Sequence, residues 1–282
     1  MRPTRGQRAA RAGVPSRRVR ADRLESPSRR ALPASRSTPI SRQTPILSLV
    51  IPAYNQRERT VASAHEAAAF LSEALDDAYE LIVVDDGSEA GRAVRPEDLP
   101  RGTSFHRHPR NFGKGGAIRT GVLNARAPHV IFTDSDLPFS LDPIPTTLEW
   151  LQNGADVVIG DRELPESKCE TQVTLMRRLS SFAFTFMVRR VVGLDFWDTQ
   201  CGYKGYRTEV ARKLYLLLGI QSFAFDVEIL ARAVRAGCTI RRQPLSLVHN
   251  EDSSVRLQRH APQMLADMLL IAWRLRRGEY DE

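Results

Sequence analysis

Short hydrophobic runs recur through the middle of the chain, and polar or glycine-rich turns follow most of them. Short runs without polar alternation are typical of strands that are buried on both faces of a parallel sheet. The runs occupy residues 46–51, 81–84, 130–132 and 156–160, and Phe105 with His106 indicates a further short strand.

The segments between these runs are rich in helix-forming residues. They predict helices over residues 58–75, 117–127 and 141–152. Strands that alternate with helices in this way form right-handed βαβ crossovers. The pattern therefore predicts an α/β fold with a doubly wound, mostly parallel sheet that is flanked by helices.

Acidic and glycine-rich turns stand where the predicted strands end. Asp85 and Asp86 follow the second run, a glycine-rich loop at residues 111–116 opens the next helix, and Asp134 and Asp136 follow the run at 130–132. Parallel sheets bind ligands at the carboxyl ends of their strands. The repetition of such turns therefore predicts a nucleotide site at this edge of the sheet.

The pair Asp134 and Asp136 has two possible interpretations. Most Asp-x-Asp pairs are solvated turns, so the motif alone is a weak signal. At the exit of a buried strand, however, two carboxylates can hold a hard cation together with a diphosphate. Two other nucleotide folds are excluded, because Lys114 is not followed by the Ser or Thr of a P-loop and no G-x-G-x-x-G follows the first strand.

The first 42 residues differ from the rest of the chain in composition. They contain 12 arginines against Asp22 and Glu25, a charge of +10, so the chain's total of +8 leaves −2 for residues 43–282. A segment of Arg, Ser, Pro and Ala cannot bury a core, and we expect it to be disordered. It is an extension without function, a polybasic segment attracted to anionic lipid or, least favoured, a transit peptide. Because the folded part is not basic, we expect no nucleic-acid partner.

Cysteine usage and hydropathy limit the setting of the protein. Its three cysteines have no metal-ligand spacing, which indicates a reducing compartment and no disulfide framework. No apolar run reaches the roughly 18 residues that a membrane span needs. We therefore expect the chain itself not to cross a membrane.

Taken together, the motifs resemble the family 2 glycosyltransferases with their GT-A fold. The first four are residues 50–55 (Val-Ile-Pro-Ala-Tyr-Asn), 83–88 (Val-Val-Asp-Asp-Gly-Ser), 111–117 (Asn-Phe-Gly-Lys-Gly-Gly-Ala) and 134–136 (Asp-Ser-Asp). Residues 198–204 (Asp-Thr-Gln-Cys-Gly-Tyr-Lys) and 223–228 (Phe-Ala-Phe-Asp-Val-Glu) resemble the polyprenyl-phosphate sugar synthases, most closely the dolichyl-phosphate β-glucosyltransferase type. The resemblance covers roughly residues 46–275, and its specificity lies in the joint order and spacing of the motifs.

The resemblance implies roles for the residues of the nucleotide half. Asp86 would contact the base and ribose, Lys114 and the backbone of Gly115 and Gly116 would face the nucleotide, and a uracil or guanine pocket would be lined by Pro52, Ala53 and Tyr54. Asp134 and Asp136 would hold a divalent metal on the diphosphate, and Mg²⁺ or Mn²⁺ suits such oxygen ligands. We expect Asp136 to be the direct contact.

The sequence departs from the family pattern at two positions. Gln56 stands where Glu is usual after Tyr-Asn, and Ala90 stands where Asp often follows Asp-Gly-Ser-x. These departures weaken any assignment of the bound nucleotide. They do not indicate an inactive site, because the acidic residues of both strand exits are present.

Candidate acceptor residues follow the Asp-Ser-Asp motif. Arg162 comes directly after a strand, so it reaches the diphosphate or sugar unless it is a solvated loop residue. By resemblance, Gln200 lies near the transferred sugar, and Asp226 contacts the acceptor or sugar unless it caps a helix. Arg256 is a candidate clamp for an acceptor phosphate. His249 is a third metal ligand or, as we favour, a loop residue.

Two segments combine apolar residues with arginines. Residues 173–192 and the predicted C-terminal helix, residues 261–282, each carry Phe, Met, Leu or Trp beside Arg. Either segment is a helix packed in the core or an interfacial helix with its apolar face in lipid and its arginines among the headgroups. The sequence leaves both interpretations open.

The predicted function is an inverting, metal-dependent hexosyl transfer from UDP-glucose or GDP-mannose to a polyprenyl phosphate. The enzyme would be cytoplasmic and peripheral on the cytoplasmic face of the membrane, with its oligomeric state open. One alternative is transfer to a hydroxyl group, and one of another class is a non-catalytic sugar-nucleotide binding or membrane-recruitment module. The tail (residues 1–42) would precede one GT-A domain. That domain would consist of a nucleotide half (residues 43–136), an acceptor half (137–260) and the C-terminal helix (261–282).

Overall fold

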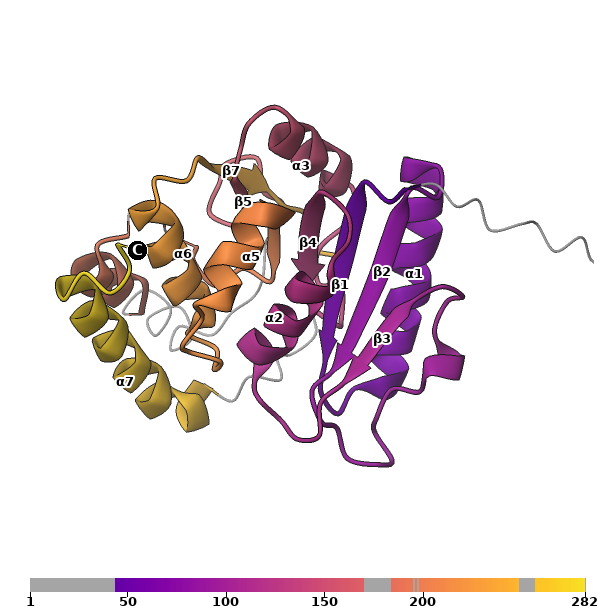
Figure 1. The fold of residues 1–282 in the computed structure, drawn as a ribbon, viewed down its shortest axis with the longest axis horizontal. Helices are drawn as coiled ribbons and strands as arrows, with labels where there is room; N and C mark the ends of the chain where they lie inside the picture. Colours follow the sequence, from indigo (N-terminus) through magenta and orange to yellow (C-terminus); the bar gives the residue numbers. More distant parts are fainter. Residues whose placement is uncertain (1–43, 170–183, 195, 197, 249–256, 282) are drawn as a thin grey trace, which may run out of the picture. The chain divides into compact units, whose positions relative to one another are not determined.

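A computed structural model describes most of the chain beyond the arginine-rich tail (Figure 1). The described residues belong to one compact unit, Ser41–Glu282. They are residues 44–169, 184–194, 196, 198–248 and 257–281. The predicted disordered tail, residues 1–42, lies outside them, as do Arg256, His249 and most of the segment 173–192.

A seven-stranded sheet lies at the centre, with the strand order β3-β2-β1-β4-β6-β5-β7 (Figure 1). Every neighbouring pair is parallel except that β6 runs antiparallel to both β4 and β5. The predicted mostly parallel α/β sheet is therefore confirmed. The strands are β1 (Leu47–Ala53), β2 (Tyr79–Asp85), β3 (Ser104–Arg107), β4 (His129–Thr133), β5 (Val157–Asp161), β6 (Tyr203–Arg207) and β7 (Ile240–Pro244).

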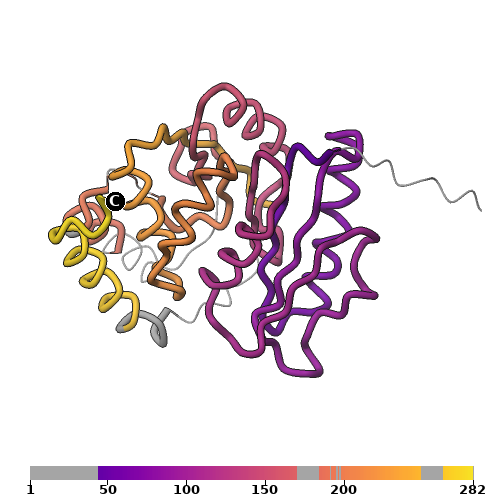
Figure 2. Tube along the Cα trace, viewed as in Figure 1, coloured from indigo at the N-terminus to yellow at the C-terminus, as the bar shows by residue number. Residues whose placement is uncertain are grey.

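Helices cover both faces of the sheet. The buried residues of α1 and the start of α3 pack on one face, and those of α2, α5 and α6 pack on the other, where α7 joins the same core. In the Cα trace, α7 forms the yellow outer edge beside α6 (Figure 2). The helices are α1 (Arg57–Leu75), α2 (Lys114–Asn124), α3 (Pro143–Gln152), α5 (Thr208–Leu216), α6 (Phe225–Arg235) and α7 (Leu257–Arg276), with short turns η1 (Pro96–Asp98) and η2 (Val188–Val192).

Two predicted helices have different ends in the structure. The helix predicted over residues 117–127 spans Lys114–Asn124. It begins earlier because Gly113 takes a φ of +93° and turns the chain directly into the helix. It ends earlier because Ala125 already has an extended backbone, with a ψ of 132°. The C-terminal helix, predicted over residues 261–282, is Leu257–Arg276, and Gly278 with a φ of +71° follows it.

The hydrophobic pattern did not predict β6, β7 or α5, and of these β6 lies inside the sheet. Its sequence, Tyr-Lys-Gly-Tyr-Arg, contains a lysine and a glycine in the middle of the sheet. The Lys204 side chain is nevertheless fully buried, because it has a buried ion partner. Gly205 is needed for packing, since a Cβ there would lie 2.7 Å from Cγ2 of Thr147 in α3.

A buried glutamate ties the amino ends of the central strands together. Glu80 of β2 accepts a hydrogen bond of 2.5 Å from Ser48 Oγ in β1 and one of 2.8 Å from Arg126 Nε, and also one from the Arg126 backbone N–H. Burial by itself raises the pKa of Glu80, but the hydrogen bonds from Ser48 and Arg126 outweigh it and hold the pKa below its usual 4.5.

We expect this carboxylate to make the stability of the fold sensitive to acid. A folded-state pKa below the unfolded one gives stability that is present above about pH 4.5 and is lost as the pH falls through the folded-state pKa. Glu80→Gln should lower the free energy of unfolding by about 1.5–3 kcal/mol at pH 7. Urea unfolding should show this gap closing below about pH 4, while Glu66→Gln on the exposed face of α1 should show no gap at either pH.

Candidate active site

The carboxyl edge of the sheet brings together residues that are far apart in the sequence. Strands β1, β2, β4 and β5 end there, and β6 begins there because it runs in the opposite direction. Thr133, the last residue of β4, pairs with Tyr203, the first residue of β6. As a result, the turn Cys201–Gly202 lies directly beside Asp134.

Asp134 is positioned by an ion pair with a lysine and by the space beside a glycine. Its Oδ1 forms an ion pair with Nζ of Lys114, the first residue of α2. On its other side, a Cβ placed on Gly202 would lie only 1.9 Å from Oδ2 of Asp134. The glycine therefore leaves the space that the carboxylate fills.

A second lysine–carboxylate pair lies in the core beside the first. Lys204 Nζ donates to Oδ1 of Asp226, in the first turn of α6, and to the carbonyl oxygen of Cys201, both at 2.7 Å. The Lys204 nitrogen also lies 5.5 Å from the centre of the Phe132 ring. Asp226 is thus used in a buried ion pair and does not cap the N–H groups of α6.

The two pairs influence each other electrostatically. Burial lowers the pKa of Lys114, but the carboxylates of Asp134 and Asp226 outweigh it and raise that pKa above its usual value. Burial raises the pKa of Asp226, against the opposing influence of Lys204 and Lys114. Two lysines and two carboxylates therefore form one group of charges at this edge.

Asp136 is the more open of the two predicted metal ligands. Its side chain is 35% exposed, and Oδ2 lies 4.0 Å from Nη1 of Arg59. Burial and the neighbouring Asp134 carboxylate both raise the pKa of Asp136. The intervening Ser135 donates a hydrogen bond of 2.8 Å to Gln56, the residue that replaces the usual Glu.

The donor set of Asp134 and Asp136 fits a cation that is shared with a ligand. Within the described residues, no three or more His, Cys, Asp or Glu side chains form a closed metal site. Mg²⁺ is commonly held by one or two carboxylates plus substrate phosphates rather than by a cage of protein ligands. The two oxygen-donor side chains match that arrangement in chemistry and number.

Asp86 shapes the glycine-rich loop. Its carboxylate is buried and accepts hydrogen bonds from the backbone N–H groups of Phe112 (2.9 Å) and Gly113 (2.8 Å). His108 Nδ1 lies 2.7 Å from the same carboxylate, and His108 Nε2 lies 2.8 Å from the hydroxyl of Thr120 in α2. Both oxygens of Asp86 are therefore used to position the start of α2, and with it Lys114.

The predicted base pocket offers one exposed side chain. Pro52 and Ala53 are buried within β1, whereas Tyr54 is 46% exposed at the end of the strand. The next residue, Asn55, has a φ of 56°, and its backbone N–H donates to Ser88 Oγ. Tyr54 thus presents its ring from a turn that is anchored to the end of β2.

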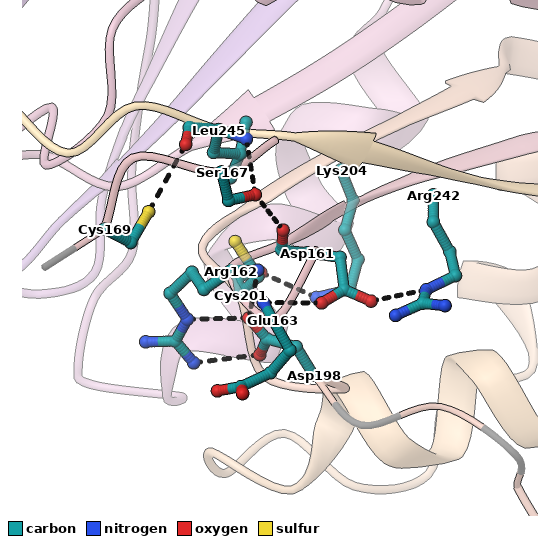
Figure 3. Close-up of polar contacts among 10 residues, drawn as sticks. All are labelled: Asp161, Arg162, Glu163, Ser167, Cys169, Asp198, Cys201, Lys204, Arg242 and Leu245. Atoms are coloured by element: carbon teal, nitrogen blue, oxygen red, sulfur yellow. Dashed lines mark hydrogen bonds and ion pairs between the residues drawn. The ribbon is translucent and has the colours of Figure 1, made fainter. Parts of the chain in front are cut away.

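Arg162 is oriented by a buried carboxylate (Figure 3). Its Nε and Nη2 lie 2.6 and 2.8 Å from the two oxygens of Asp198, and its backbone N–H donates to the same side chain. The preceding residue, Asp161, pairs with Nε of Arg242 at 2.5 Å. Because the Arg162 side chain remains 47% exposed, its outer edge can still face a ligand.

Gln200 and Glu228 connect the loops around α6. Gln200 Nε2 donates to the carbonyl oxygen of Phe223 at 3.2 Å, which joins the turn before β6 to the start of α6. Glu228 is fully buried, accepts from the N–H groups of Gly219 and Ile220 and pairs with Arg232, so it acts as a structural anchor.

Three residues of the site were not predicted as such from the sequence. Lys204 and Asp198 lie in the quoted motif at residues 198–204, but their partners, Asp226 and Arg162, are 22 and 36 positions away. His108 lies in a segment without a recognisable motif. No local signal marked Lys204, because a lysine is almost never fully buried unless it is paired, and its partner is distant in the sequence.

Comparison with known proteins agrees with the geometry. Residues 48–215 match the family model described as Glycosyl transferase family 2. The dolichyl-phosphate beta-glucosyltransferase of Dictyostelium discoideum is 29% identical over 242 residues, which cover 81% of this chain and 74% of that protein. The protein of the same name from Mus musculus is 30% identical over 253 residues, which cover 82% and 78% of the two chains.

A solved structure supports the same fold. Glucosyl-3-phosphoglycerate synthase from Mycobacterium tuberculosis, in complex with Mn²⁺, UDP and glucosyl-3-phosphoglycerate, matches with a TM-score of 0.52 at 20% identity. The match covers 82% of this chain and 80% of that one. The predicted GT-A fold is therefore confirmed.

The buried Lys204–Asp226 pair leads to a stability prediction. Lys204→Met leaves the Asp226 carboxyl buried without its cation and should lower the free energy of unfolding by about 3–5 kcal/mol. The double variant Lys204→Met/Asp226→Leu should recover most of that loss in urea unfolding. Lys213→Met on the exposed side of α5 is the matched control. A single-variant loss close to that of the control would show that the pair is not important for stability.

Proposed function

This chain belongs to glycosyl transferase family 2, and we propose that it transfers glucose from UDP-glucose to the phosphate of a polyprenyl carrier such as dolichyl phosphate. The glucose and the carrier follow the names of the relatives. The observation that carries the proposal is the Lys114–Asp134 pair, which Gly202 holds beside Asp136 at the carboxyl edge of the sheet. With a divalent cation on the two carboxylates, this group of charges would suit a nucleoside diphosphate.

The donor half of the site would bind and stabilise the leaving UDP. Asp134 and Asp136 would hold Mg²⁺ or Mn²⁺, which supplies positive charge for the diphosphate as the bond to the sugar breaks. Lys114 lies beside Asp134 and can donate to the phosphate oxygens. The exposed ring of Tyr54 offers a stacking surface for the base at the end of β1.

The state of Asp226 supports a phosphate acceptor over a hydroxyl acceptor. A hydroxyl group needs a general base, but the Asp226 carboxyl is buried and binds Lys204. A phosphate monoester has a second pKa of about 6 and is largely dianionic at neutral pH, so it needs positioning and neutralisation more than a base. The half-exposed guanidinium of Arg162 can supply part of that positive charge.

The transfer would be a single displacement. The acceptor oxygen attacks the anomeric carbon from the face opposite to the leaving diphosphate, which inverts the configuration. No protein nucleophile is needed, and Cys201 is not suited to be one. Its side chain is fully buried, and burial raises the pKa of the Cys201 thiol far above its usual value.

A lipid-linked acceptor places the reaction at a membrane surface. Within the described residues, no helix is long and apolar enough to cross a bilayer. We propose a peripheral association with the cytoplasmic face, because the phosphate of a lipid carrier lies at the membrane surface and nucleotide sugars are available on that side.

Asp136→Asn tests the catalytic role of the open carboxylate. Removing this charge should lower glucose transfer by about 100-fold or more, because the diphosphate loses its cation ligand. The assay incubates the purified protein with UDP-glucose, Mn²⁺ and detergent-dispersed dolichyl phosphate, and measures lipid-extractable glucose. A chelator should abolish the signal. Asp76→Asn, at an exposed left-handed position after α1, is the matched control.

The same assay separates the possible donors and acceptors. Parallel reactions contain GDP-mannose as donor, or a hydroxyl compound such as 3-phosphoglycerate as acceptor, and for the latter the glucosylated product is measured in the aqueous phase. Faster transfer to the hydroxyl compound would overturn the proposed acceptor, and undiminished transfer by Asp136→Asn would overturn the proposed metal site.

Gly202→Ala tests the packing that positions Asp134. The new methyl group would overlap the Asp134 carboxylate, since a Cβ at this position would lie 1.9 Å from Oδ2. We expect transfer to fall by about 100-fold, with a far smaller change in the urea midpoint. Gly91→Ala is the matched control, because nothing lies within 4 Å of its Cβ position. Wild-type activity in Gly202→Ala would show that the position of Asp134 is not critical.

A further inference from the structure

Helix α7 is apolar on two opposite sides. Its inner side packs into the core with α6 and η2. A surface helix of a globular protein normally needs only one such side. The buried inner residues are Met264, Met268, Ile271, Ala272 and Leu275.

The outer side of α7 exposes three large apolar residues at regular spacing. Leu265 is 45% exposed, Leu269 is 57% exposed and Trp273 is 49% exposed. Residues four positions apart lie on the same face of a helix, so the three form one stripe along its axis. We call these residues the outer stripe. Phe186, which is 59% exposed, lies just before η2, the segment against which α7 packs.

Two exposed arginines follow the outer stripe, and one of them is paired, because Arg277 Nε lies 3.6 Å from Oε1 of Glu279, which is 40% exposed. Arg276 and Arg277 follow the outer stripe on the same side of the helix, and both are exposed. The Arg277 guanidinium lies 4.5 Å from the centre of the Trp273 ring. Within residues 263–277, no acidic side chain is exposed, because Asp267 is buried on the inner side.

We propose that the outer stripe is a docking surface for an anionic lipid membrane, with α7 lying in the plane of the interface. Leu265 and Leu269 enter the acyl region, while Trp273 and the two arginines lie among the headgroups. An in-plane position agrees with the finding that no described helix is suited to cross a bilayer. Headgroup phosphates complement the exposed Arg276 and Arg277 at the end of the stripe.

This inference deepens the proposed function, because a polyprenyl phosphate acceptor is itself held in a membrane. Its test does not use the transfer reaction. The full chain is mixed with phosphatidylcholine vesicles that contain phosphatidylglycerol, with or without brominated acyl chains. Brominated chains quench tryptophan only where a ring enters the bilayer, so the readout reports insertion and not mere binding by the arginine-rich tail.

We expect brominated lipid to quench the wild-type fluorescence and Trp273→Phe to lose that quenching. Trp150, which is half-buried on α3, and Trp197 both remain in this variant, so the quenching that it loses is assigned to Trp273. Leu265→Ser/Leu269→Ser should weaken vesicle binding about tenfold. Val234→Ser, an equally exposed apolar residue on α6, should bind like the wild type.

Arg276→Gln/Arg277→Gln should lose binding to anionic vesicles more than Arg92→Gln/Arg101→Gln, which removes two exposed arginines elsewhere.

Two results would overturn the proposal. One is vesicle binding without quenching of Trp273, which would assign binding to another surface. The other is a concentration-dependent dimer that Leu265→Ser/Leu269→Ser abolishes, which would identify a second copy as the occupant. Failure of the proposed function looks different, because the wild-type protein would then insert into vesicles but transfer no glucose. Leu265→Ser/Leu269→Ser should still glucosylate detergent-dispersed acceptor.

Discussion

Two lysine–carboxylate pairs determine how the carboxyl edge of the sheet is built. An unpaired charge cannot be buried at an acceptable free energy, so Lys204 in the core requires Asp226 and the Cys201 carbonyl as partners. The antiparallel direction of β6 meets this requirement, because it points Lys204 toward the first turn of α6. It also places Gly202 against Asp134, where Lys114 closes the second pair. The topology of the sheet and the charges of the site thus depend on each other.

The sequence predicted those parts of the fold that depend on local pattern. The strands that end near Asp85, Asp134 and Asp161 were expected because their apolar runs are buried on both faces, and the turns after them are polar. Strand β6 was not expected, because a lysine normally indicates an exposed position. Lys204 is buried only because Asp226, which is distant in the sequence, neutralises its charge. The pairing of Arg162 with Asp198 was missed for the same reason. Long-range ion pairs have no local pattern, so the position of Arg162 after a strand indicated a site residue but not its partner.

Several charged residues of the site are used to hold the protein itself. Asp86 was expected at the base and ribose, yet both of its oxygens accept hydrogen bonds from the chain, so any contribution to nucleotide binding acts beside its role in shaping the loop. Two of the guanidinium nitrogens of Arg162 bind Asp198, and Lys114 is paired with Asp134. Little uncommitted positive charge therefore remains for a diphosphate and a phosphate together. This shortage is a physical reason why a divalent cation suits the site.

The position of α7 relative to the site is fixed by polar contacts rather than by apolar packing alone. Asp267, on its inner side, accepts a hydrogen bond of 2.5 Å from Ser222 in the loop that leads to α6. Further along α7, Nη1 of Arg274 lies 3.6 Å from Glu228 of α6. These two contacts hold α7 against the first turn of α6, where Asp226 lies. If the outer stripe rests on a membrane, the depth of that helix fixes the height of Asp226 and its neighbours above the lipid. A short connection of this kind would let a phosphate at the bilayer surface reach the sugar while the long polyprenyl chain stays in the membrane.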